Sequence, residues 1–123
     1  MHTKNARYRT KEILARDMVT VLAAPLSFGT KYAVLDDALW KWSEFHGKHD
    51  GCPYWSEEAR KIGGPAKELR HEHLIPRRVL IAELVARPPE TAEALMVWLN
   101  RHCIGVVVTR ADGFPPQGSW RTR

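Results

Sequence analysis

The chain is organised around one stretch, residues 68–78, which reads ELRHEHLIPRR. It holds two histidines and two glutamates, three arginines stand around them, and a proline precedes the last two arginines. A proline suits the first turn of a helix but not its interior. The stretch therefore predicts an extended or irregular segment over residues 70–75, followed by a helix from Pro76 to Arg87.

An extended segment would also sort its side chains between two faces. Successive residues of a strand point to opposite sides. His71 and His73 would then share one face, and Arg70 and Glu72 the other.

Outward from this stretch, apolar residues recur at helical spacing. They predict helices over residues 11–24, 31–46, 57–62, 76–87 and 90–102. Residues 104–109 form a short run that is rich in β-branched side chains, which predicts a strand. That strand must pair with another segment, either near residues 69–75 or in a second subunit, so a dimer through strand 104–109 is one expectation.

These elements define the expected fold class. We expect one α+β domain over residues 1–123, mostly helical, with four or five helices, one short C-terminal strand and little sheet. Residues 1–9 would form a flexible basic arm and residues 113–123 a Pro/Gly-rich tail.

Composition limits the classes of protein to which this chain can belong. The chain has 123 residues, a net charge of +5 and 27% charged residues, which is typical of one globular domain. No apolar run approaches the roughly 20 residues of a membrane span, and no secretory signal is recognisable. We therefore expect a cytoplasmic protein with no membrane partner, with Cys52 and Cys103 as free thiols. The sequence has no phosphate-loop motif, so nucleotide binding by such a loop is not expected. It also has no Gly-x-Ser-x-Gly motif, so a serine hydrolase of the kind that uses this motif is not expected.

Basic side chains gather at the N-terminus and in the central stretch. Such clusters are typical of a protein that binds a polyanion, although a solvated basic face is an equally good interpretation. The expected nucleic-acid or anion-binding residues are Arg70, Arg77, Arg78, Arg7, Arg9 and Lys11.

The neighbouring glutamate and histidine are compatible with metal-assisted phosphodiester hydrolysis. In that hypothesis His73 is the general base, Glu72 binds the metal or orients the histidine, and His71 or His102 assists. The candidate catalytic residues are His73, Glu72 and His71, and the candidate metal ligands are Glu72, His73 and His102. The sequence requires no cofactor, but a divalent metal fits this hypothesis.

Two other interpretations of the histidines stay open. In the first, His71 and His73 satisfy backbone groups at a strand–helix junction, and Glu72 pairs with Arg70 or Arg78. In the second, a structural zinc ion uses ligand-type residues such as His46, His49 and Cys52, whose tight spacing is suitable although it follows no standard pattern.

Residues 70–80, RHEHLIPRRVL, resemble a segment of small uncharacterised bacterial and phage-borne proteins. In these, a helix start like Trp55–Ala59 precedes a His-Glu-His-x-x-Pro motif, and a helix pair and a Val/Thr-rich strand follow. The resemblance covers residues 54–112. It implies the architecture, and it suggests a role in phage or mobile-element defence or counter-defence.

The part Glu72-His73-x-x-Pro76 is also similar to the first half of an HNH nuclease motif. The second half departs from that motif, because an apolar helix follows and no Cys-x-x-Cys pair is present. Asn100 and His102 would lie on a second helix, so they close such a site only through a different topology.

Three functions follow from these observations. The first is a small, basic, non-enzymatic protein that binds nucleic acid or a nucleoprotein machine, acting as an inhibitor. The second is a metal-dependent, HNH-like nuclease centred on Glu72 and His73. The third is a protein–protein interaction module that uses exposed Trp40 and Trp120 as anchors.

Overall fold

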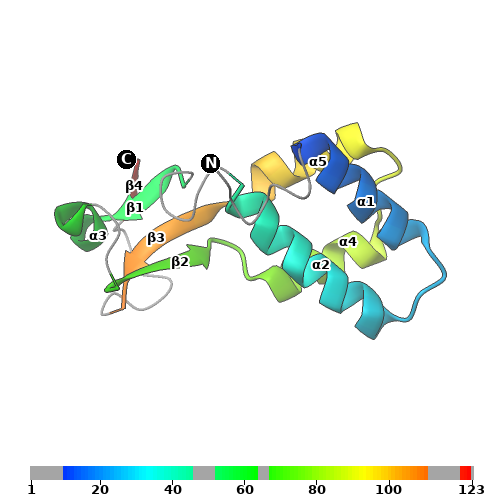
Figure 1. The fold of residues 1–123 in the computed structure, drawn as a ribbon, viewed down its shortest axis with the longest axis horizontal. Coiled ribbons are helices and arrows are strands. Elements are labelled where there is room, and N and C mark those ends of the chain that lie inside the picture. The colour runs from blue at the N-terminus through cyan, green and yellow to red at the C-terminus, as the bar shows by residue number, and fades with distance from the viewer. Residues whose placement is uncertain (1–9, 46–51, 64–66, 111–119, 123) are drawn as a thin grey trace.

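The computed structural model describes residues 10–45, 52–63 and 67–110, together with the backbone of residues 120–122. The basic arm expected at residues 1–9 and most of the expected tail lie outside these residues. Four helices gather at one end of the molecule, and a sheet with a short fifth helix forms the other end (Figure 1). The elements are α1 (Lys11–Ala23), α2 (Phe28–Ser43), β1 (Tyr54–Ser56), α3 (Glu57–Ile62), β2 (Leu69–His73), α4 (Arg77–Ala86), α5 (Ala92–His102), β3 (Gly105–Thr109) and β4 (Trp120–Thr122).

Hydroxyl side chains fix where helices begin. The hydroxyl of Thr10 accepts the backbone N–H of Ile13 at the start of α1, which begins at residue 11 as predicted. The expected start of α2 at residue 31 is wrong: the hydroxyl of Ser27 caps this helix, which begins at Phe28. Pro76 stands at the N-cap position of α4, where its missing N–H costs no helical hydrogen bond.

The helical end has its own apolar core. Apolar side chains recur along each helix at helical spacing, so each helix turns one stripe toward the others. The fully buried members include Leu14 and Met18 of α1, Leu35 and Leu39 of α2, Ile81 and Leu84 of α4, and Leu95 and Leu99 of α5.

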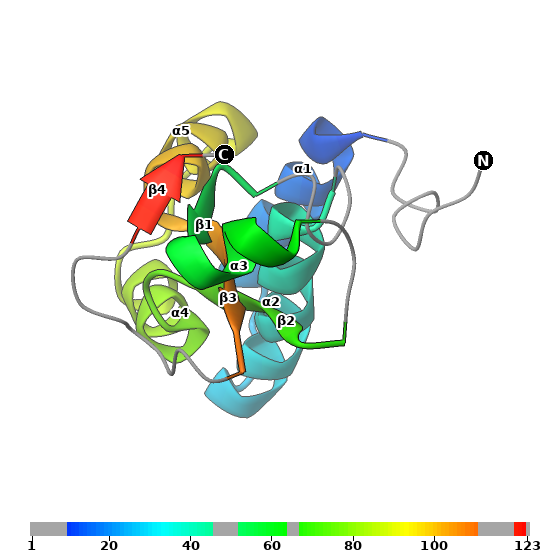
Figure 2. The same ribbon diagram turned by 90° about the vertical axis from the view of Figure 1, so that its left-hand side faces the viewer.

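The sheet has the strand order β2-β3-β1-β4. The strands β2 and β3 run antiparallel, with His71 opposite Val107 and His73 opposite Gly105. β1 runs parallel to β3 and antiparallel to β4. A second, smaller apolar cluster of Cys52, Trp55, Ala59, Leu69 and Val107 lies where α3 covers the sheet (Figure 2).

The expected fold class, α+β and mostly helical, is confirmed. The predicted strand at residues 104–109 and its pairing with the region of residues 69–75 are also confirmed. The sheet is larger than predicted, since it has four strands where one was expected. β1 and β4 each have three residues, which is too short for an alternating pattern to stand out in the sequence.

The expected dimer through strand 104–109 is wrong. β3 lies inside the sheet and pairs with β2 on one side and β1 on the other. Both of its edges are therefore occupied within the chain. Among the described residues, no helix is both long and apolar enough to cross a membrane.

Candidate functional site

The central stretch forms β2, an edge strand of the described sheet, and its side chains alternate as predicted. His71 and His73 are buried on the face that meets the helices, Arg70 is exposed and Glu72 is half-buried. The two histidines therefore lie at the junction between the helical end and the sheet.

His71 lies between a carboxylate and a thiol. Its Nδ1 is 3.5 Å from Oε2 of Glu44, and both side chains are 0% exposed. Its Nε2 is 3.6 Å from Sγ of Cys52, which is also buried. Glu44 caps the C-terminal end of α2, where the helix dipole disfavours negative charge. The imidazole therefore faces a buried carboxylate at the end of a helix.

Gly105 makes room for this arrangement. A Cβ at that position would overlap Nε2 of His71 and come within 3.1 Å of Sγ of Cys52. β3 cannot move aside, because it is paired on both edges. Only glycine lets the imidazole approach the strand this closely.

His73 contacts the last turn of α2. Its Nε2 is 2.9 Å from the hydroxyl of Ser43, and that hydroxyl also contacts the carbonyl of Trp40. The hydroxyl has one hydrogen, so which of these two contacts it donates to depends on the tautomer of the His73 imidazole. Burial lowers the pKa of His73 to about 4, and the charges of His71 and Arg77 act in the same direction. His73 is therefore neutral at pH 7.

Trp40 covers both histidines. The centroid of its ring is 4.8 Å from that of His71 and 5.0 Å from that of His73, and the two imidazoles stack at 5.6 Å. The guanidinium of Arg77 lies 4.6 Å from the Trp40 ring. Trp40 is half-buried, so it links the buried histidines to the surface.

A groove of about 690 Å³ runs along β2 over this cluster. We call it the arginine groove, because Arg70 of β2, Arg77 of α4 and Arg110, which follows β3, all line it together with Trp40. Nη2 of Arg70 is 2.9 Å from Oε2 of Glu72, a pairing that the sequence offered as one alternative.

The other two arginines of the groove are also held in place. Nη1 of Arg77 is 3.1 Å from Oδ1 of Asp36 and donates to the Asp36 carbonyl. Nε of Arg110 donates to the carbonyl of Lys67. Each of the three guanidinium groups therefore has at least one protein contact beside the groove.

The remaining predicted anion-binding residues lie elsewhere. Arg78 lines a different, apolar groove with Phe28, Val79 and Trp98. Lys11 lies on α1, where its Nζ is 4.3 Å from the ring of Trp42. Burial lowers the pKa of Lys11. Arg7 and Arg9 lie outside the described residues.

The structure brings two of the three predicted metal ligands near each other. Glu72 and His73 alternate along β2 and both line the arginine groove, whereas His102 lies apart from them, beside Trp98 on α5. In the described part of the chain, no group of three His, Cys, Asp or Glu side chains is arranged to hold a metal ion. His46 and His49, considered with Cys52 for zinc, lie outside that part.

The two cysteines are buried free thiols, as expected. Burial, with a smaller effect from Glu44, raises the pKa of Cys52 to about 12. Burial also raises the pKa of Cys103 to about 12. Neither thiol is ionised at pH 7, and the thiolate is the reactive form. Nucleophilic cysteine chemistry therefore has no support here.

Sequence reasoning missed Glu44, the partnership of Cys52 with His71, and Arg110. One signal was present: Trp40 and Glu44 are four residues apart at the end of α2, so they share a side of it. The contacts of Cys52 and Arg110 depend on the sheet pairing, which no local pattern encodes.

Comparison with known proteins found no match for this chain among family models, curated proteins or solved structures.

Proposed function

We propose that this chain is a non-enzymatic nucleic-acid-binding protein that holds a single strand in the arginine groove. One observation carries the proposal: three guanidinium groups, from β2, from α4 and from the residue that follows β3, line one groove beside a tryptophan. Guanidinium groups suit phosphate because they offer several donors in a fixed plane. Inhibition of a nucleoprotein machine, which the resemblance suggests, is a role that such binding would serve.

The shape of the site favours a single strand. A groove of about 690 Å³ is in the range of small-molecule sites, so it admits a few nucleotides of one strand. The rigid, convex surface of a duplex would reach only its rim. Because Glu72 and Asp36 already pair with two of the arginines, we expect modest affinity that is sensitive to salt.

The salt dependence can be estimated. For single strands the logarithm of the binding constant falls with the logarithm of salt concentration by roughly 0.7 per phosphate contact. Three contacts predict a slope of about −2. Each arginine replaced by glutamine should reduce the steepness by about 0.7.

The test is fluorescence anisotropy with labelled single- and double-stranded DNA and RNA over a range of salt concentrations. The variants are Arg70→Gln, Arg77→Gln and Arg110→Gln. The matched control is Arg87→Gln, since Arg87 lies at the end of the same helix as Arg77 and also pairs with a carboxylate, that of Glu83. Weaker binding and a shallower slope in the groove variants alone would support the proposal. No binding, or equal losses in Arg87→Gln, would refute it.

The same samples test the alternative, a metal-assisted phosphodiesterase. It requires Glu72 and His73, which both line the arginine groove, to act at one metal, although they alternate along β2. It also requires His73 to accept a proton, although its pKa is lowered to about 4. Cleavage that needs Mg²⁺ or Mn²⁺ and is lost in His73→Gln would establish the nuclease in place of the binding protein.

A further inference from the structure

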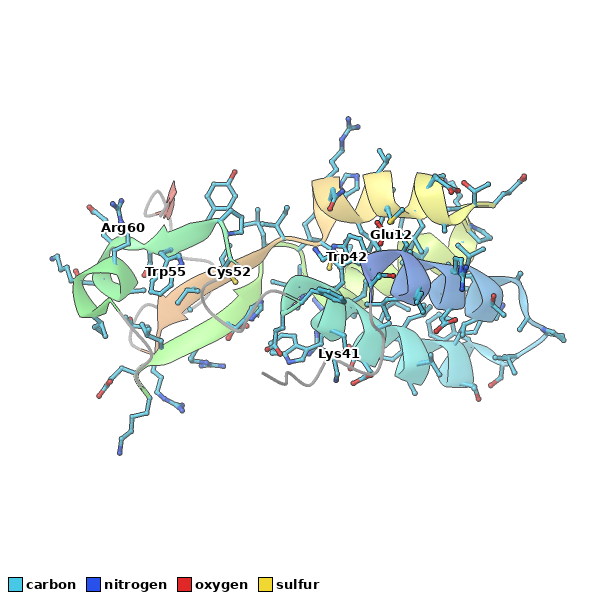
Figure 3. All side chains as sticks on the ribbon, turned by 45° about the horizontal axis from the view of Figure 1, so that its top comes forward. Glu12, Lys41, Trp42, Cys52, Trp55 and Arg60 are labelled. Atoms are coloured by element: carbon cyan, nitrogen blue, oxygen red, sulfur yellow. The ribbon has the colours of Figure 1, made fainter. Side chains whose placement is uncertain are left out.

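A second groove, of about 790 Å³, lies in the helical end of the molecule, the half that holds Trp42, and not in the sheet end that holds Trp55 (Figure 3). We propose that this apolar groove binds an acidic amphipathic helix of a protein partner. This inference does not depend on nucleic-acid binding. The lining of the groove includes Phe28 and Tyr32 of α2, Arg78 and Val79 of α4, and Trp98 and His102 of α5.

The packing of the helices leaves this side of the helical end open. α4 packs against α2 and α5 packs against α1, whereas α4 and α5 are not among the closely packed pairs of described helices. Both lie on the same side of the helical end (Figure 2), and both line the apolar groove. The groove therefore lies where two helices that follow each other in the chain are not closed against each other.

Large apolar side chains stay exposed in this groove. Phe28 is 54% exposed and Val79 is 48% exposed, and Tyr32 and Trp98 are half-buried. The rings of Phe28 and Tyr32 contact each other, with their centroids 5.9 Å apart. Apolar side chains that gather in one exposed patch mark a binding surface, and aromatic residues are frequent anchors of protein interfaces. The partner must therefore present an apolar face.

The walls of the groove favour a helix over an extended peptide. Apart from Ile75, the residues that line it belong to α2, α4 and α5. The backbone N–H and C=O groups of a helix bond mostly within that helix. An extended peptide needs the free backbone edge of a sheet, which helical walls do not offer. An amphipathic helix satisfies its own backbone and places apolar side chains at positions i, i+3, i+4 and i+7 in such a groove.

The charges beside the groove favour an acidic partner. Among the described residues that line it, Glu83 carries the only carboxylate, and that carboxylate accepts two hydrogen bonds from Arg87, of 2.7 and 2.9 Å. Arg78 is exposed and has no carboxylate partner within the described part of the chain. A carboxylate of the partner can therefore pair with Arg78 without displacing an existing ion pair.

A second copy of this chain is a poor occupant of the apolar groove. Each copy carries a net charge of +5, so two copies repel each other. The apolar stripes of the described helices are also buried in the core of the helical end. A different protein, with an acidic helix, fits the groove better.

The first test is selection from a displayed library of helical peptides, with the full chain as the target. In this library the spacing of the apolar residues and the charge of the other positions vary independently. Enriched peptides should carry apolar residues at positions i, i+3, i+4 and i+7 and acidic residues beside them. No enrichment, enrichment without this spacing, or enrichment of basic peptides would overturn the proposal.

The second test measures the binding of the most enriched peptide to variants by fluorescence anisotropy. Val79→Lys should weaken binding about tenfold or more, although it adds a positive charge, because it removes an apolar contact. Val97→Lys is the matched control, since Val97 is 65% exposed on α5 and does not line the groove; it should bind as the wild type does. If Val79→Lys does not fold by circular dichroism, Ala82→Lys, at an exposed position of the same groove, takes its place.

Two further variants separate this site from the arginine groove. Arg78→Gln should weaken peptide binding about two- to fivefold and make it less sensitive to salt, whereas Arg77→Gln should leave it unchanged. Equal binding by the wild type and Val79→Lys, or a loss in Arg77→Gln, would overturn the proposal. So would a dimer of the chain alone, seen by sedimentation velocity, that Val79→Lys abolishes, because a second copy would then be the occupant.

Discussion

Replacing Gly105 by alanine should destabilise the protein through one identifiable overlap. The added methyl group would collide with Nε2 of His71 and come within 3.1 Å of Sγ of Cys52. Neither side can yield easily, because β3 is paired on both edges and the His71 side chain is fully buried. Inserting a methyl group into a well-packed interior costs about 1–3 kcal/mol.

The expected loss can be measured as a change in unfolding temperature. For a chain of this size, each kcal/mol lowers the midpoint by roughly 3–6 °C, so we expect a decrease of about 3–18 °C. Thermal and urea unfolding, followed by circular dichroism, would report it.

Gly29→Ala is the matched control. Gly29 is the second residue of α2, and a Cβ there would meet no other atom within 4 Å. Alanine is favoured over glycine in a helix by about 0.5–1 kcal/mol, so this variant should be slightly more stable than the wild type. The same chemical change should therefore have opposite signs at the two glycines.

A double-mutant cycle identifies the partner. If the overlap with His71 causes the loss, Gly105→Ala should cost less in a His71→Ala background than in the wild type. Wild-type stability in Gly105→Ala, or an equal cost in both backgrounds, would refute the reasoning.

Two further predictions concern single residues. Gly63 ends α3 with φ of 87° and has open space where a Cβ would lie. Gly63→Ala should therefore lower the free energy of unfolding by about 1–2 kcal/mol through backbone strain alone. Urea unfolding would show this loss, and an unchanged midpoint would contradict it. The pKa of His73 falls from its ordinary value of 6.5 to about 4 on folding. The unfolded chain therefore binds more protons between these values, and stability should be lost as the pH falls from about 6.5 to 4, by about 3 kcal/mol for this group. Unfolding at several pH values should show a shallower dependence in His73→Gln, and an equal dependence in both proteins would refute the assignment.

The predictable part of the fold is the part that local patterns encode. The stripe that includes Leu35 and Leu39 predicted α2, and Pro76 predicted where α4 begins. The segment over residues 70–75 predicted an alternation that β2 follows: His71 and His73 share the buried face, and Arg70 and Glu72 the other. These features depend on residues within one or two turns of each other, so one sequence is enough to reveal them.

The part of the site that escaped prediction depends on contacts distant in sequence. His71 meets Glu44 and Cys52 only because β2 pairs with β3 beside the end of α2. Arg110 reaches the groove because the same pairing brings it next to Lys67. Neither contact leaves a periodic trace in the sequence.

The buried polar layer also explains why β2 has only one workable register. A slip by one residue would exchange the two faces of the strand. Arg70 and Glu72 would then face the helices, and His71 would face away from Glu44. Burying a guanidinium and a second carboxylate beside Glu44 is costly unless each is paired and hydrogen-bonded, whereas an imidazole can be buried without a charge. Histidines at alternate positions thus make the native register the one that buries polar groups at least cost. That register also directs Arg70 away from the helices.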